Sequence, residues 1–156
     1  MKTTANRKPT ADAIKAFNGD PCLGHLSTPI SDSAWVRNYL KNLPIYRPGL
    51  KALQRGLEIG AAHGFFLIGP FAKLGPLRDS EYANLAALAS AIGLVFIAKA
   101  GMRLYGIATF SKAQKSSDPL ETYRGWADLS KGFFKGGAVG ALGGFVVLEI
   151  LHLVGL

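Results

Sequence analysis

The sequence predicts an all-α membrane protein with three transmembrane helices, an extended N-terminal arm and a short interfacial helix. Of its 156 residues, 49% are hydrophobic and only 18% are charged, which is an apolar balance for one small domain. Residues 82–98 carry no charged side chain, and residues 136–156 carry only Glu149. Because a bilayer core is about 30 Å thick, a helix of about 20 such residues can cross it.

The predicted N-terminal arm covers residues 1–52 and is polar, with scattered Pro and Gly. No secretory signal or transit peptide is recognisable in it. Its lone cysteine, Cys22, allows neither an internal disulfide nor a thiolate metal cluster, and His25 carries no functional signal.

Near the end of the arm, a short helix that Asp32 or Ser33 can cap and that ends before Pro44 is expected. In it Trp35 and Tyr39 recur with helical spacing, opposite cationic residues. A short helix of this kind lies flat on the membrane surface or docks on a protein neighbour, and the sequence leaves both open.

The predicted transmembrane domain covers residues 53–156, with helices at about 53–74, 83–110 and 132–154. The first helix would span about 33 Å. It includes Pro70 near its far end, and it carries Glu58 and His63 inside its apolar run. Polar groups at membrane depth are costly and commonly functional, so each of the two needs a partner.

The net charge of +8 is sorted by membrane side. Nine of the 18 basic residues precede the first predicted helix or lie in its first turn, and five more lie between the second helix and the apolar start of the third. The first connection carries only Lys73 and Arg78. The positive-inside rule then places the N-terminus on the stromal or cytoplasmic side and the C-terminus in the lumen. This sorting argues for a lipid bilayer, and against nucleic acid, as the partner of the basic residues.

Two sets of glycines recur at every fourth residue, and in a helix each set forms a smooth stripe. The first set is Gly56, Gly60 and Gly64, and the second is Gly132, Gly136, Gly140 and Gly144. Such a stripe lets another helix, or a flat ring such as a pigment, approach the backbone closely. The second set does not form a phosphate-binding loop, because no Gly-Lys-Ser/Thr follows a strand there.

Glu58 and His63 are predicted to lie at different depths and on different faces of the first helix. They lie about 7 Å and about 15 Å below its start and point about 140° apart. A carboxylate and a neutral imidazole can each supply the single axial ligand of a chlorophyll Mg²⁺. The alternative for His63 is a hydrogen-bonded packing residue.

Glu58 has an alternative of its own, an ion pair within the membrane. Arg103 on the second helix is predicted at a similar depth, Lys99 lies deeper, and Arg55 is one turn away from Glu58. Near the lumenal end of the third helix, Glu149 and His152 share one face and are expected to face water or each other. A haem between His63 and His152 is excluded by their difference in depth of about 15 Å.

Several segments together resemble the photosystem I reaction-centre subunit XI family (the L subunit), in its cyanobacterial type. They are NGDPCLGHLSTPISDS at 18–33, NLPIYRPGL at 42–50, and RGLEIGAAHGFFLIGPFAKLGPLRDSEYANLAAL at 55–88. The last helix matches mainly in pattern. The residues Lys99 and Arg103 are unusual, since the family is mostly apolar there.

The resemblance implies a multi-pass subunit of the photosynthetic (thylakoid) membrane, packed on the photosystem I core and its small membrane subunits. It implies bound chlorophyll a and beta-carotene, and chlorophyll ligands at His63 and Glu58. It also implies contacts with other copies in a trimer, as in cyanobacteria, or docking of peripheral antenna, as in plants. It also implies a calcium ion at the oligomer interface, near the Pro76 carbonyl and Asp79.

The function expected from the sequence is therefore that of a non-catalytic photosystem I subunit that binds antenna chlorophyll and carotenoid and joins reaction centres. No arrangement of catalytic residues indicates an enzyme. One alternative is a small proton-coupled membrane transporter that uses Glu58, His63, Glu149 and His152 as a relay. Another is a structural adaptor without pigment, which accounts for the glycine stripes but not for His63.

Overall fold

A computed structural model describes residues 14–16 and 26–155 of the chain. The chain divides into two units, Met1–Tyr46 and Arg47–Leu156. The boundary lies six residues before the one predicted, because the residues from Arg47 onward fold against the first long helix. Cys22 and His25 lie outside the described residues.

In the first unit, two short strands, β1 (Lys15–Ala16) and β2 (Leu26–Ser27), pair antiparallel. They are followed by the helix α1 (Ala34–Asn42), which starts where the Ser33 hydroxyl accepts a hydrogen bond from the Val36 amide. The rings of Trp35 and Tyr39 stack along α1 with centroids 5.8 Å apart, and both side chains are exposed. The sequence thus predicted this helix, and its location at a membrane or a protein surface stays a prediction.

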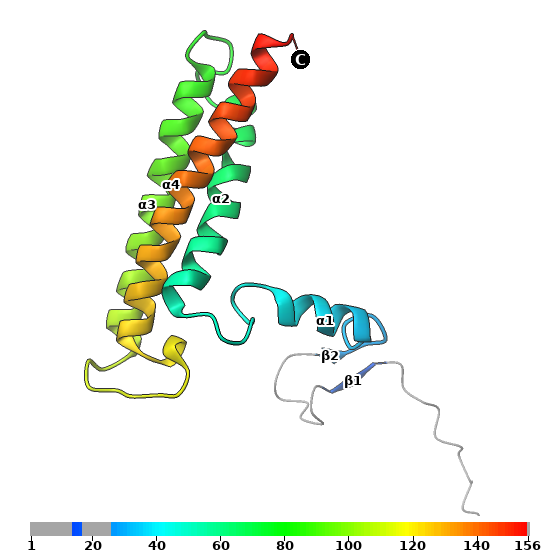
Figure 1. The fold of residues 1–156 in the computed structure, drawn as a ribbon, viewed down its shortest axis with the longest axis vertical. Coiled ribbons are helices and arrows are strands. Elements are labelled where there is room, and N and C mark those ends of the chain that lie inside the picture. Colours follow the sequence, from blue (N-terminus) through cyan, green and yellow to red (C-terminus); the bar gives the residue numbers. More distant parts are fainter. Residues whose placement is uncertain (1–13, 17–25, 156) are drawn as a thin grey trace, which may run out of the picture. The chain divides into compact units, whose positions relative to one another are not determined.

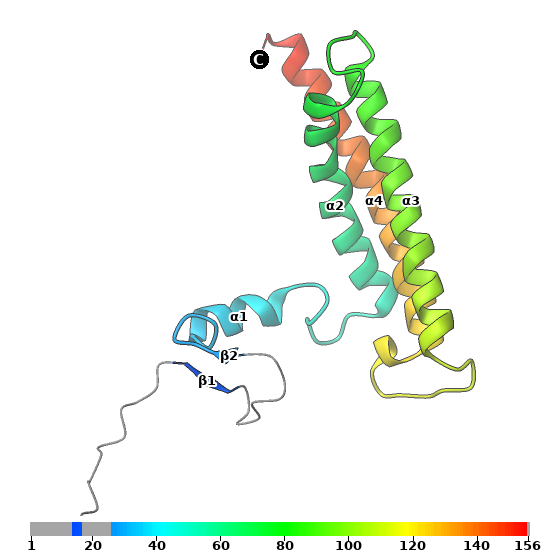
Figure 2. The ribbon, with the colours of Figure 1, turned by 180° about the vertical axis from the view of Figure 1, so that it is seen from behind.

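The second unit consists of three long helices that lie side by side in both views of the molecule (Figures 1 and 2). These are α2 (Ala52–Leu74), α3 (Ala83–Thr109) and α4 (Tyr123–Leu153). A short 3₁₀ helix, η3 (Pro119–Glu121), precedes α4. The bounds of α2 and α3 lie within one residue of those expected from the sequence.

The third long helix begins nine residues earlier than the predicted span at 132. The Thr122 hydroxyl accepts a hydrogen bond from the Gly125 amide and caps the helix. The Trp126 indole donates to the Leu120 carbonyl and holds η3 against the first turns of α4. The predicted span at 132–154 covers only the apolar part of this helix, because its first turns are amphipathic, with Arg124, Asp128 and Lys131 among them.

The two glycine stripes pack against each other, so that α2 and α4 approach backbone to backbone. A Cβ atom added at Gly60 would lie 2.1 Å from the Phe133 carbonyl oxygen, and one at Gly136 would lie 2.0 Å from the Leu57 carbonyl oxygen. Gly56, Gly64, Gly132 and Gly140 make equally close backbone contacts across the same interface. The sequence left two roles open for these stripes, packing against a helix and packing against a flat ring. In the structure the stripes pack helix against helix.

Toward the far end of α2 the packing continues through small side chains. Ile68, Ala87, Ala91 and Ala141 are almost completely buried and form one cluster from all three helices. The opposite, outward faces of α3 and α4 carry many exposed large apolar side chains. They include Leu94, Phe96, Ile97, Leu104, Ile107, Val139, Leu142, Val146 and Ile150. An apolar surface of this extent on a small unit marks contact with lipid or with other proteins.

Among the described helices, α3 and α4 are long and apolar enough to cross a membrane. The helix α2 has 23 residues, but its composition does not meet the requirement for a membrane-crossing helix that α3 and α4 meet. It carries Arg55, Glu58, His63 and Lys73.

Candidate functional site

The imidazole of His63 lies on the exposed surface of α2, with one ring nitrogen fixed by the backbone. Its Nδ1 atom is 2.7 Å from the Ile59 carbonyl oxygen, one turn earlier in the helix. Since a carbonyl only accepts a hydrogen bond, Nδ1 carries the proton in the neutral ring, and Nε2 holds the free lone pair.

The ring of His63 is also held in place by α4. It meets the Phe133 ring edge to face, with centroids 5.5 Å apart. No other hydrogen bond or ion pair to His63 is made by the part of the chain that the structure describes. Phe66, one turn further along α2, is 73% exposed and extends the apolar surface beside the imidazole. An oriented neutral imidazole whose second nitrogen hydrogen-bonds a carbonyl is the usual arrangement of a histidine metal ligand.

The place for a flat ring differs from the one that the glycines of α2 suggested. A flat ring was one of the two occupants that the sequence allowed beside Gly60 and Gly64, and α4 occupies that space instead. A ring at His63 has to lie on the outward face of α2, away from the glycine stripe.

Glu58 forms a two-point ion pair with Arg47. The distances are 3.2 Å from Nη1 to Oε1 and 3.0 Å from Nη2 to Oε2, and both side chains are about two-fifths exposed. Arg47 lies before α2, and Gly49 between them has a φ of 80°, in the left-handed region that favours glycine. The turn at Gly49 returns the chain, so that Arg47 reaches the carboxylate.

The predicted alternative for Glu58, an ion pair with Arg103, is therefore wrong. The Arg103 guanidinium lies over the Tyr123 ring, 4.6 Å from its centroid, and donates to the Tyr123 hydroxyl. Arg55 also points elsewhere, since it donates to the carbonyl oxygens of Leu50 and Arg47. Depths estimated from the sequence apply only to residues inside the predicted helices. Arg47 lies in the turn before α2, so they could not reveal it as the partner of Glu58.

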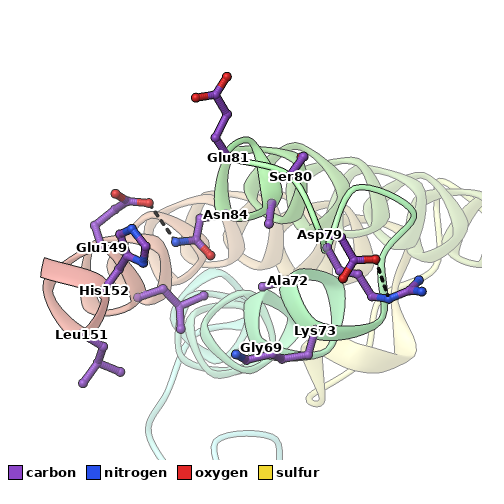
Figure 3. A pocket seen from close by; sticks show the side chains of 13 residues that line it. Gly69, Ala72, Lys73, Asp79, Ser80, Glu81, Asn84, Glu149, Leu151 and His152 are labelled. Atoms are coloured by element: carbon purple, nitrogen blue, oxygen red, sulfur yellow. Dashed lines mark hydrogen bonds and ion pairs between the residues drawn. The ribbon is translucent and has the colours of Figure 1, made fainter. Parts of the chain in front are cut away.

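At the opposite end of the three helices, a cavity of about 710 Å³ lies beside the turn between α2 and α3 (Figure 3). Asp79 lines it, and its carboxylate is 3.5 Å from the Arg78 guanidinium and 85% exposed. The Pro76 carbonyl accepts no hydrogen bond from the described residues. These two oxygen donors fall short of the six to eight that Ca²⁺ takes.

On α4, the Glu149 carboxylate accepts a hydrogen bond of 2.9 Å from the Asn84 amide, a partner that the sequence did not indicate (Figure 3). His152 lines the same cavity and is exposed. In Figure 3 both lie apart from Asp79. Among the described residues, no group of three His, Cys, Asp or Glu side chains could hold a metal ion.

The groups of a possible proton relay lie in separate places, except that Glu149 and His152 line the same cavity. Glu58 is paired with Arg47 and Glu149 with Asn84, while His63 is exposed on the outward face of α2. This arrangement favours separate binding sites over one continuous path for a proton.

Comparison with known proteins identifies similar chains. Residues 13–153 match the family described as photosystem I reaction centre subunit XI. The chain is 53% identical over 143 residues to the photosystem I reaction center subunit XI of a Cyanothece species, covering 92% of this chain and 90% of the relative. It is 52% identical over 143 residues to that of Thermosynechococcus vestitus, covering 92% of each chain. The chloroplastic protein of Cucumis sativus is 43% identical over 159 residues, covering 94% of this chain and 73% of the relative.

Proposed function

Because this chain belongs to the photosystem I reaction centre subunit XI family, we propose that it is a three-span subunit that binds pigment and joins reaction centres. As a member of this family it is a non-catalytic component of photosystem I in the thylakoid membrane. The proposal adds that it holds chlorophyll a and beta-carotene and makes the contact between copies in a trimer.

The proposal of three spans rests on how α2 packs. The helices α3 and α4 are long and apolar enough to cross a membrane. The backbone contacts of α2 with α4 run from Gly56 beside Leu129 to Gly144 beside Phe65. A helix that follows α4 over this length shares its depth, and about 34 Å of α2 suffices to cross. The ion pair with Arg47 also lowers the cost of placing the Glu58 charge near the membrane.

The proposed orientation has the N-terminus on the stromal or cytoplasmic side, because that side collects the basic residues. Trypsin added to this side of intact membranes should cut at Lys112 or Lys115, in the exposed connection between α3 and α4. Arg78, in the turn on the other side, is the internal control and should be cut only after the membranes are opened. Cutting at Arg78 alone in intact membranes would reverse the orientation.

The observation that carries pigment binding is the free Nε2 of His63, on an outward apolar face and with its tautomer fixed by Ile59. We infer that Nε2 supplies the axial ligand of a chlorophyll Mg²⁺. The bound pigment would contribute light absorption and excitation transfer, while the protein orients it and excludes water from the metal. Replacing His63 by leucine should remove or spectrally shift one pigment of the assembled photosystem.

Glu58 is the second proposed chlorophyll ligand, on a different face of α2. Its carboxylate oxygens each keep a lone pair beyond the hydrogen bond from Arg47, so the ion pair and ligation can coexist. The exposed aliphatic and aromatic side chains of α3 and α4 suit the hydrocarbon chain of beta-carotene.

The proposed oligomer contact lies at the turn after α2. The Pro76 carbonyl and Asp79 would give two oxygen ligands to a calcium ion, and another chain or water would have to supply the others. An incomplete set of ligands on an exposed turn is what a cation shared between subunits requires. The rival function, proton-coupled transport, lacks a connected set of titratable groups in the described residues.

A further inference from the structure

Two cations of α3 have no acidic partner in the described part of the chain, although they lie within a membrane-length helix. The Lys99 ammonium sits 5.2 Å from the centroid of the Phe96 ring and 5.5 Å from that of Phe134. The Arg103 guanidinium lies over the Tyr123 ring. Aromatic faces attract a cation but leave its charge in place.

The acidic groups of this end of the molecule are already engaged by other residues. Asp128 pairs with Lys131 at 3.3 Å, and Glu58 pairs with Arg47. Glu121 accepts from the Ser116 hydroxyl, and Asp118 accepts from the Leu120 amide. An anion for Lys99 and Arg103 therefore has to come from outside the described residues.

The depth of the two cations follows from their contacts with α4. Phe134, which Lys99 touches, directly precedes Lys135, and after Lys135 the helix contains only one charged residue, Glu149. Lys99 thus lies where the polar start of α4 gives way to its apolar part. That level is one turn deeper than Arg103, which reaches toward Tyr123, the first residue of α4, and both long side chains can extend toward the headgroups of the basic-side leaflet.

Helical spacing places Lys99 and Arg103 one turn apart on the same face of α3, beside α4. Deeper in the membrane the adjoining turns are apolar, with Ile92 on α3 and Ala138 and Leu142 on α4. A pair of cations above an apolar surface is complementary to an anionic lipid, which has a negative headgroup above its acyl chains. The guanidinium offers a fork of donors for phosphate oxygens, and the ammonium adds a point charge.

We propose that Lys99 and Arg103 form a binding site for the phosphodiester headgroup of an anionic lipid in the basic-side leaflet, with its acyl chains along the exposed apolar side chains of α3 and α4. The proposal rests on the membrane placement of these helices but not on pigment ligation. It also gives a role to the two residues that the sequence marked as unusual in this helix.

The test uses the assembled photosystem, gently solubilised, with its co-purifying lipids counted by mass spectrometry. The double variant Lys99→Met, Arg103→Met should lose about one anionic lipid for each copy of the chain, with pigment content unchanged. The control variant Lys112→Met, Lys115→Met removes two exposed cations from the connection on the same side and should lose none. Equal lipid counts in both variants would overturn the site, whatever the pigment content.

Further measurements separate the sources of the anion. After removal of lipids, phosphatidylglycerol should rebind to the complex in preference to phosphatidylcholine, and inorganic phosphate should not displace it. Displacement by phosphate alone would overturn the choice of a lipid. Loss of a neighbouring subunit from the double variant, with its lipid count unchanged, would reassign the cations to an acidic group of that neighbour.

Labelling of the unmodified complex keeps the test decisive if the double variant does not assemble. A phosphatidylglycerol with a photoreactive acyl chain should mark peptides that contain residues 92–104 or 134–142. Labelling of this chain confined to other peptides would contradict the site.

Discussion

At the scale of single residues, two contacts hold the His63 ring and leave Nε2 available. The Ile59 carbonyl fixes the proton on Nδ1, and the Phe133 ring restricts the rotation of the imidazole. A ligand whose orientation is fixed before the metal arrives loses less conformational freedom when it binds. In the proposed pigment site, the protein would therefore contribute mainly by orienting the imidazole.

The Glu58–Arg47 pair gives a prediction that separates ligation from charge pairing. Glu58→Gln removes the negative charge that pairs with Arg47 but keeps an oxygen that can ligate Mg²⁺. Pigment content should therefore be unchanged. Because both side chains are partly exposed, the loss of stability should be about 0.2–1 kcal/mol. The temperature at which the subunit leaves the complex measures it.

A double-mutant cycle identifies the partner. Arg47→Met should add little to the effect of Glu58→Gln, whereas Arg103→Met, the control, should act independently. Additive effects with Arg47, or pigment loss in Glu58→Gln alone, would contradict this account of the pair.

The sequence marks His63 and Glu58 as candidate site residues, because a polar side chain inside an apolar run is conspicuous. It could not identify Arg47, which lies eleven residues before Glu58 and reaches it only through the turn at Gly49. Nor could it reveal Phe133 beside His63, since that contact depends on how two helices far apart in the sequence are aligned.

At the scale of the elements, the interface between α2 and α4 depends on glycine. Gly60→Ala would place a methyl group 2.1 Å from the Phe133 carbonyl oxygen, and a backbone atom cannot move aside as a side chain can. The helices would have to separate, at a cost of about 1–3 kcal/mol by analogy with overpacked cores. The subunit should then leave the complex at a lower temperature and accumulate less.

Gly93→Ala is the matched control for this prediction. Gly93 lies on α3, and a Cβ atom there would have no neighbour within 4 Å. Gly93→Ala should therefore leave the temperature at which the subunit leaves the complex unchanged. If Gly60→Ala and Gly93→Ala behave alike, the close approach of α2 and α4 is not what stabilises the unit.

The stripes themselves were visible in the sequence, but their occupant was not. Spacing by four residues shows that a smooth face exists, and it does not distinguish a second helix from a flat ring. For a related reason, the sequence did not indicate that α4 begins nine residues before the predicted span. An apolar run locates the membrane-length part of a helix, while its amphipathic first turns depend on the cap at Thr122 and the packing of η3.

At the scale of the whole molecule, the mainly helical fold with three long helices followed from composition and from the spacing of apolar runs. The assembly of the photosystem could not be predicted in the same way, because a single chain supplies only one side of each contact between subunits. The turn after α2 illustrates this, since its oxygen donors are too few for a complete calcium site.

The proposed oligomer contact leads to a prediction for this turn. Asp79→Ala should reduce the fraction of photosystem oligomers on native gels, since it removes one of the two ligands that the chain offers to calcium. Calcium chelation should have the same effect on the unmodified complex and no further effect on the variant. Glu81→Ala, the control, removes another exposed acid of the same turn. An oligomer fraction that resists both Asp79→Ala and chelation would exclude this site.

The central claim, that this subunit binds chlorophyll through His63, is tested most directly by the pigment content and absorption spectrum of the photosystem carrying His63→Leu. The control is His152→Leu, the same replacement at an exposed histidine to which no pigment is assigned. We predict that His63→Leu assembles but loses one chlorophyll for each copy of the chain, or shifts its absorption band where water replaces the imidazole. His152→Leu should keep the pigment content and spectrum of the unmodified complex. Identical pigment content and spectra in both variants and the unmodified complex would contradict the claim.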